Sequence, residues 1–383
     1  MKKEMKKIVL ILFVFCALEA QAQSLGGEIV RKKEKPTLRS AWSTNDAHTK
    51  VVYKRTDKRL NVADVDYNSY SEALKAEADK GNASAQYALS NVYAKGLGIE
   101  VDENKAQCYL QKALERNYPA ALYTWGRLLQ MGVDGVEQNN EEGYKYLQMA
   151  ADKEYKDAYY YLGWNYYKGI GTSINYVKAR MYFEKSASEN DSYALYMLGA
   201  IYNMGQGVSV NPTKAFDYLM KSAKLKNADA QATVGKFYLY GRGVAKSEEK
   251  AFEWFTHSAN NGSLEGNHWL AVCYNEGLGV ERNPKEAFKR YTLSADQGFA
   301  ESQVRLGIHY MGGDDVAPKD VKKAIVYFIS SANQGNALAQ YCLGECYLDG
   351  SIGEIDKYKA KVWFQKAAAQ GEQHAIEALN YLK

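Results

Sequence analysis

Residues that commonly build metal and catalytic sites are few in this chain. Of 383 residues, five are histidine and five are cysteine, and the histidines stand at unrelated positions. A metal site needs three or four converging ligands, and Glu265 and His268, one helical turn apart, have no third partner on the next turn. His268 is therefore interpreted as a surface histidine. No Gly-x-Ser-x-Gly elbow occurs, and the Ser-x-x-Lys at Ser247 to Lys250 lacks the further motifs of penicillin-recognising serine enzymes. We expect no enzyme, no cofactor and no metal.

Long apolar runs are also missing. No segment reaches the eighteen or more apolar residues that a membrane-spanning helix requires. The run at residues 8–18 follows four lysines and precedes Ala20-Gln21-Ala22, a small-x-small site of the kind that signal peptidase cleaves. These features predict a signal peptide at residues 1–22. The mature protein is expected to be exported, periplasmic or secreted, with no transmembrane segment.

A strong net charge is absent as well. The formal charge is +4 for the whole chain and +2 without residues 1–22, which is not typical of a nucleic-acid-binding protein. Residues 23–65 carry ten Lys or Arg against five Asp or Glu, so subtraction leaves the remaining chain mildly acidic, at about −3. Because this segment also lacks a helical period, we expect a basic, flexible arm that the rest of the chain could attract.

The dominant feature is an internal repeat. Residues 82–371 contain eight copies of a unit that is 36 residues long, or 37 in two cases, with a half-unit before and after them. A period of this length indicates stacked supersecondary units, each of which buries its apolar face against its neighbours. The pattern predicts one elongated array of about eighteen helices over residues 66–383. Its function is expected on a surface and not in a pocket.

Each copy predicts two helices. Numbered from the start of a copy, place 4 is small, place 8 is large and apolar, and place 12 is usually Tyr, which is helical spacing. Place 9 is Gly in six copies; because mid-helix Gly costs about 1 kcal/mol relative to Ala, a closely approaching partner helix is expected there. A Gly-x-Gly break follows, whose first Gly is expected to be a left-handed C-cap. The second helix, rich in Ala, is predicted to begin at caps such as Asn211, Asn283 and Ser247.

These motifs resemble the Sel-one-like repeat family, a branch of the tetratricopeptide-like solenoids. The copy that begins at Asp191 carries the complete first half of the family pattern, and residues 250–262 and 359–371 carry the second half. The resemblance implies a right-handed α-α superhelix of eight helix-pair repeats with a half-repeat at each end. It also implies a role as an assembly or adaptor surface, commonly in signalling or cell-envelope processes, without one shared activity.

The array contains four cysteines, Cys108, Cys273, Cys342 and Cys346. A disulfide framework would place a pair in every repeat, whereas most repeats have none, so Cys273 and Cys346 are interpreted as small apolar filler. In the Sel-one-like repeat family, which these motifs resemble, some cysteine-rich members are associated with penicillin binding or hydrolysis. This chain lacks their regular cysteine pairs, and β-lactam hydrolase-like activity is retained only as a third hypothesis.

The candidate partner-binding residues lie on a second stripe of the first helices, at places 6, 10 and 13. The resemblance to solenoids suggests that this stripe lines the concave surface. Exposed Tyr and Trp give a large contact area at a small entropy cost, although Tyr at place 6 could equally pack against the next repeat. The candidates are Tyr123, Arg127, Tyr160, Trp164, Tyr167, Tyr196 and Lys236.

Together these features predict an exported, non-catalytic scaffold that gathers partner proteins or peptides in the cell envelope through its concave surface. A glycan-binding envelope module is the alternative, in which the same aromatic side chains would contact saccharides. Nucleic acid is not an expected partner.

Overall fold

The computed structural model describes residues 67–97, 99–133 and 135–382, and the predicted signal peptide and basic arm lie outside them. All regular structure in these ranges is α-helical, and eighteen helices follow one another without a strand. The helix-pair solenoid predicted from the repeat is therefore confirmed, with α4 and α21 as the half-units at its ends. The described residues fall into two compact units, 67–210 and 211–382.

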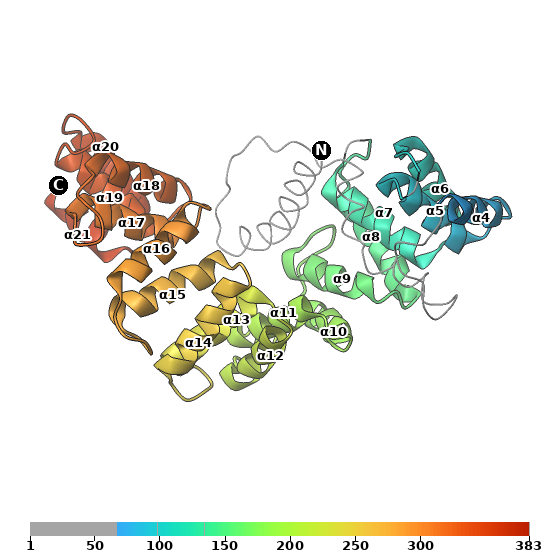
Figure 1. Ribbon diagram of the computed structural model, residues 1–383, viewed down its shortest axis with the longest axis horizontal. Coiled ribbons are helices and arrows are strands. Elements are labelled where there is room, and N and C mark those ends of the chain that lie inside the picture. Colours follow the sequence, from blue (N-terminus) through green and yellow to red (C-terminus); the bar gives the residue numbers. More distant parts are fainter. Residues whose placement is uncertain (1–66, 98, 134, 383) are drawn as a thin grey trace. The chain divides into compact units, whose positions relative to one another are not determined.

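The amino-terminal unit contains three complete helix pairs, preceded by α4 and followed by the first helix of the fourth repeat (Figure 1). Within this unit α5, α7 and α9 each pack against the second helix of their own repeat and against the helix before them, and α11 packs against α10. Its helices are α4 (Tyr67–Asp79), α5 (Ala83–Lys95), α6 (Glu103–Glu115), α7 (Pro119–Met131), α8 (Asn140–Asp152), α9 (Asp157–Lys168), α10 (Tyr176–Ala187) and α11 (Ser192–Met204).

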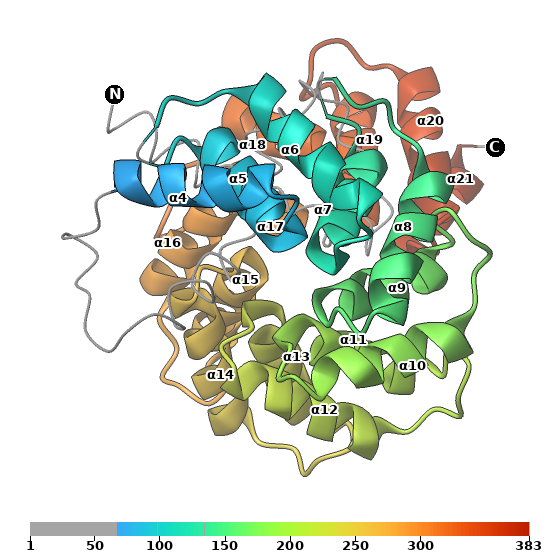
Figure 2. The ribbon, with the colours of Figure 1, turned by 90° about the vertical axis from the view of Figure 1, so that its right-hand side faces the viewer.

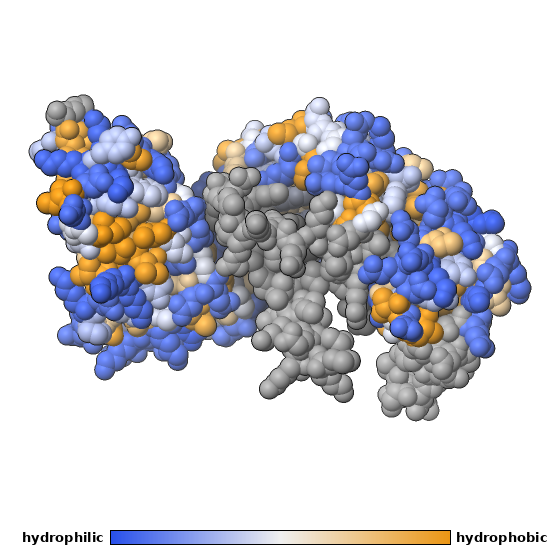
Figure 3. Space-filling model, turned by 90° about the horizontal axis from the view of Figure 1, so that it is seen from above, coloured by the Kyte–Doolittle hydropathy of each residue, from blue (hydrophilic) through white to orange (hydrophobic). Residues whose placement is uncertain are grey.

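The carboxy-terminal unit contains four complete pairs between α12 and α21, and its consecutive helices pack in the same way (Figure 2). The face of this unit that Figure 3 shows on its left side is hydrophilic around an apolar area. Its helices are α12 (Pro212–Lys224), α13 (Ala228–Tyr240), α14 (Glu248–Asn260), α15 (Leu264–Glu276), α16 (Pro284–Ala295), α17 (Ala300–Gly312), α18 (Val321–Asn333), α19 (Ala337–Leu348), α20 (Lys357–Ala368) and α21 (Gln373–Tyr381).

The helix ends follow the predicted caps. The Asn211 and Asn283 side chains each accept a hydrogen bond from the backbone N–H three residues on, with Pro at the next position. The Ser247 hydroxyl accepts in the same way from Lys250, so the Ser-x-x-Lys pair is a helix start. Gly205 ends α11 with φ of +71°, which is the left-handed conformation that glycine adopts most easily.

Glycine at place 9 allows the two helices of a repeat to touch. A Cβ on Gly163 would lie 2.7 Å from the ring of Phe183, and a Cβ on Gly235 would lie 2.5 Å from the ring of Phe255. Both phenylalanines are completely buried. The expected close approach of a partner helix is thus confirmed, and the packed ring compensates for the helix-weakening effect of Gly.

Buried polar side chains link helices of the carboxy-terminal unit, serines within one repeat and glutamines between successive repeats. The Ser258 hydroxyl donates to the carbonyl of Ala228 at 2.7 Å, and the Gln231 amide donates to the carbonyl of Ala223 at 3.0 Å. The serine bond recurs one and two repeats later, from Ser294 and Ser331, and the glutamine bond recurs two and three repeats later, from Gln303 and Gln340. Since each bond satisfies a buried carbonyl, the set favours one register between repeats.

Candidate interaction surface

The side chains at place 6 point toward the next repeat. The Tyr87 hydroxyl lies 3.0 Å from the Thr124 hydroxyl of the following first helix. Tyr123 is only 6% exposed, and its ring contacts those of Tyr155 and Tyr161 at 5.3 and 5.7 Å between centroids. Burial raises the pKa of Tyr123 well above its usual range. For Tyr123, packing between repeats is the interpretation that the geometry favours, and little of its surface is left for a partner.

Two further place-6 candidates are partly buried. The ring of Tyr160 lies 5.8 Å from that of Phe183, in its own repeat, and 6.2 Å from that of Tyr193, in the next. Burial raises the pKa of Tyr160 as well. Tyr196 is also partly buried. These tyrosines are packed side chains, and they offer a partner only part of their surface.

Trp164 and Tyr167 form the flattest aromatic surface among the candidates. Their rings are stacked, with centroids 5.8 Å apart and planes inclined by 19°. The ammonium of Lys168 lies 5.3 Å from the Trp164 centroid and 5.6 Å from the Tyr167 centroid. Tyr176, at the start of α10, meets Tyr167 edge-on at 5.4 Å. Since the neighbouring side chains hold the pair in place, a partner would meet a preformed aromatic surface with a positive charge beside it.

Arg127 is held by a ring of the next repeat. Its guanidinium carbon lies 3.7 Å from the centroid of Tyr161, which is close enough for a cation–π interaction. Tyr161 also contacts Tyr160 edge-on at 5.2 Å. A cation at place 10 of one first helix therefore pairs with a ring at place 7 of the next.

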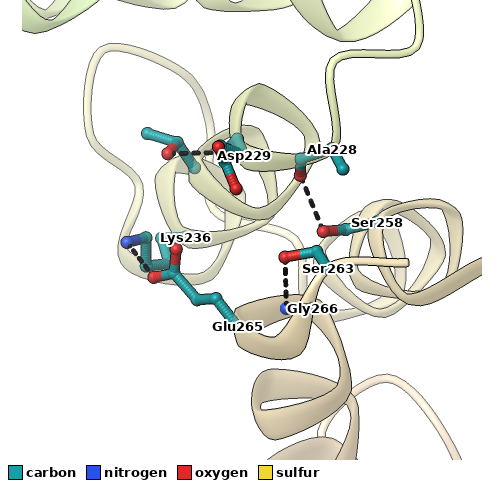
Figure 4. A network of polar contacts seen from close by, with 8 residues as sticks. Ala228, Asp229, Lys236, Ser258, Ser263, Glu265 and Gly266 are labelled. Carbon is teal, nitrogen blue, oxygen red and sulfur yellow. Dashed lines mark hydrogen bonds and ion pairs between the residues drawn. The ribbon is translucent and has the colours of Figure 1, made fainter. Parts of the chain in front are cut away.

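Lys236 belongs to the carboxy-terminal unit, whereas the other six candidates belong to the amino-terminal unit. Its ammonium lies 2.6 Å from a carboxylate oxygen of Glu265 on the next first helix, and the two side chains are 31% and 23% exposed (Figure 4). Figure 4 also shows the Ser258 bond to Ala228 close to this pair. The pair joins place 10 of one repeat to place 3 of the next.

The candidate stripe is consequently rotated from its predicted position. Its place-6 members are the most buried, and the more open stripe runs through places 3, 7, 10 and 14, again at helical spacing. We name this the outer stripe of a first helix. The sequence carries one signal for it, the acidic residues at place 3 of the third, fifth, sixth and seventh copies: Asp157, Asp229, Glu265 and Glu301.

The interpretation of His268 as a surface histidine is wrong. His268 stands at place 6, is 6% exposed, and shares a hydrogen bond of 3.0 Å between its Nδ1 and the Ser302 hydroxyl. The rings of Trp269, Tyr291 and Phe299 lie around it. Burial, reinforced by the nearby positive charge of Arg305, lowers the pKa of His268 to about 3. The imidazole is therefore neutral and serves as a core group.

The four cysteines within the described ranges are free thiols. Cys273 and Cys346 are buried in the core, as predicted, and burial raises their pKa values to about 12 and about 11. Within the described ranges, no three His, Cys, Asp or Glu side chains converge closely enough to hold a metal ion. None of the helices that the structure describes combines the length and hydropathy needed to cross a bilayer.

Comparison with known proteins identifies the repeat. The Sel1 repeat model matches residues 83–118, 119–155, 156–191, 192–227, 228–263, 264–299, 300–336 and 337–372, one residue later than the copies read from the sequence. A solved structure of c5321, a protective antigen present in uropathogenic Escherichia coli strains displaying an SLR fold, is 28% identical, with a TM-score of 0.64 over 82% of this chain and 67% of that chain.

A Sel1 repeat protein from Oxalobacter formigenes shares the fold at 24% identity, with a TM-score of 0.58 over 94% of this chain and 99% of that chain. The eight matched segments follow one another without a gap through nearly all the described helices. The chain belongs to the Sel1 repeat family, whose members are in general non-catalytic scaffolds for protein–protein interactions.

Proposed function

We propose that this protein is an exported scaffold that binds protein segments in the cell envelope through the outer stripes of its first helices. The observation that carries this proposal is the stacking of Trp164, on the outer stripe of α9, against Tyr167 at the adjoining place 13, with Lys168 of the outer stripe beside both rings. Interaction surfaces are enriched in Trp and Tyr, which supply a large contact area.

The pair is suited to binding because its geometry exists before a partner arrives. Trp164 and Tyr167 stand one turn apart on α9, and both remain partly exposed. Two aromatic side chains that are already ordered lose little conformational entropy on binding, so contact area converts efficiently into affinity.

The test compares two forms of the full chain with partners captured from a cell-envelope extract. Trp164→Ala with Tyr167→Ala should weaken capture of specific partners at least about tenfold, which corresponds to about 1.4 kcal/mol. Tyr358→Ala, which removes an exposed tyrosine from the second helix α20, is the matched control and should leave capture unchanged. Unchanged capture by the double variant, with an unaltered unfolding curve, would remove this site from consideration.

The same stacked rings could also face sugar rings, which is the basis of the glycan-binding alternative. A glycan array probed with the full chain and with the double variant separates the two functions. Binding of envelope saccharides that the double variant loses would replace the protein partner by a glycan.

Export is supported by the amino-terminal pattern of lysines, apolar residues 8–18 and Ala20-Gln21-Ala22. Mass spectrometry of the protein recovered from its producing cells should find a first residue of Gln23. An intact Met1 in the recovered protein would contradict export by this route.

A further inference from the structure

The outer stripes of the two units differ in charge. The first helices of the amino-terminal unit, α5, α7, α9 and α11, carry three basic residues and one acidic residue. The first helices of the carboxy-terminal unit, α13, α15, α17 and α19, carry two basic and five acidic residues. One repeat geometry thus presents opposite charges on equivalent helices.

Three of the five acidic side chains on these carboxy-terminal first helices form no ion pair with another described residue. Lys236 is already paired with Glu265. Among the described residues no ion pair is formed by Glu276, Glu301, Glu345 or Asp349, and Arg305 is the one cation of these helices that also has none. We name these four carboxylates, together with Ile308, the acidic face.

Within the acidic face, Glu301 and Glu345 are the carboxylates whose surroundings raise the pKa. Glu301 is partly buried, and burial with the nearby charge of Glu265 raises the pKa of its carboxyl. Burial and the charge of Asp349 raise the pKa of Glu345 in the same way. Glu301 is partly desolvated beside the like charge of Glu265, and Glu345 lies beside the like charge of Asp349, so an incoming cation would stabilise both carboxylates.

Apolar surface lies on the same stripe. Ile308 follows Glu301 by seven residues on α17, which places both on one face of that helix, and Ile308 is 42% exposed. On α13, Tyr240 is 65% exposed and meets Trp269 of α15 edge-on at 6.2 Å. A partner that only supplied positive charge would leave these groups exposed to water.

We propose that the acidic face binds a protein segment in which lysine or arginine side chains alternate with apolar ones. The cations would meet Glu301 and Glu345, and an apolar side chain would cover Ile308. Charge complementarity selects this partner class, because an acidic segment would meet the four carboxylates of the acidic face, while Arg305 is the one cation without an ion pair on the described first helices of this unit. The inference rests on the proposed scaffold function but concerns a different unit from Trp164 and Tyr167.

The experiment selects random twelve-residue peptides displayed on phage against the full chain, after depletion on a variant with Glu301→Gln, Glu345→Gln and Ile308→Ser. The peptides that remain should be enriched in Lys or Arg and in apolar residues. Their synthetic forms, measured by fluorescence anisotropy, should bind the triple variant at least about tenfold more weakly, and 0.5 M NaCl should weaken their binding to the wild type.

Two controls keep the result interpretable. Glu253→Gln removes an exposed carboxylate from the second helix α14 and should leave peptide affinity unchanged. Thermal unfolding must show that the triple variant is folded, and Glu345→Gln alone, at an exposed position, should still weaken binding severalfold.

The outcomes also separate this inference from the proposed function. Basic and apolar peptides that keep their affinity for the chain with Trp164→Ala and Tyr167→Ala support a second surface. Peptides without basic residues, or basic peptides whose affinity the triple variant leaves unchanged, would overturn it. If peptides depend on Trp164 but none depends on Glu301 or Glu345, the scaffold function stands and the acidic face is not a binding site.

Discussion

The two units of this protein are packed in the same way inside and differ in the chemistry of their surfaces. Phe183 in the amino-terminal unit and Phe255 in the carboxy-terminal unit fill equivalent core positions against equivalent glycines. The links between successive first helices are different, because Arg127 meets the ring of Tyr161 in one unit and Lys236 meets the carboxylate of Glu265 in the other. A repeat constrains its packed places strongly and its outer stripe weakly, so the chemistry of the surface can vary while the fold is kept.

The largest expected effect tests whether the interiors are equivalent. Phe183→Ala and Phe255→Ala should each destabilise the protein by about 3–5 kcal/mol, because each removes a fully buried ring and leaves a cavity against a glycine. Urea denaturation measures the loss, and hydrogen exchange should place the weakened amides in the unit that carries the substitution. A loss below about 1 kcal/mol in one unit would show that the two cores are not equivalent.

A smaller effect should separate the units by their response to acid. The folded-state pKa of His268, about 3, lies below the usual value of 6.5, so protonation favours the unfolded state. The stabilisation from the neutral imidazole is complete above about pH 6.5 and is lost as the pH falls below that value. Linkage gives a loss of about 2 kcal/mol between pH 7 and pH 5.

The variant His268→Gln should remove this share of the acid sensitivity, because the amide does not titrate and can still bond to the Ser302 hydroxyl. Urea denaturation at both pH values measures the difference between the variant and the wild type. Equal slopes of stability with pH in the two proteins would contradict the buried neutral histidine.

The smallest effect concerns the links between first helices. A double-mutant cycle with Lys236→Met and Glu265→Gln should give a coupling of about 0.5–1 kcal/mol, since both side chains are partly exposed. A cycle with Arg127→Met and Tyr161→Leu should give a similar value from the cation–π contact. The first coupling should fall by more than half in 1 M NaCl and the second should fall less, as the two links differ in their sensitivity to screening. An equal response to salt would mean that the chemical contrast between the units has no energetic consequence.

Much of the architecture was predictable because it is local and repeated. The period located every helix pair, Gly205 and Ser247 marked helix ends, and the glycines at place 9 anticipated contact with a second helix. These features depend on backbone conformation and on spacing along one helix, and eight copies make such a pattern visible.

The candidate site was predicted less well. Tyr123 and His268 occupy places that look like a polar, aromatic stripe, yet both face the next repeat and are buried. The glutamine bonds between repeats, such as that from Gln231 to Ala223, were not anticipated either. Spacing on one helix shows which side chains share a face but not which face the neighbouring repeat covers.

The amino-acid pattern was therefore sufficient to establish the helices, their pairing and their repeat family, since these follow from short-range periodicity and from steric rules that hold in every copy. The rotation of each first helix against the following repeat could not be read from that pattern, and it decides which side chains remain open. It depends on contacts made about 30 residues apart along the chain, as between Lys236 and Glu265. Those contacts turn His268 inward and leave Trp164, Tyr167 and the acidic face available to partners.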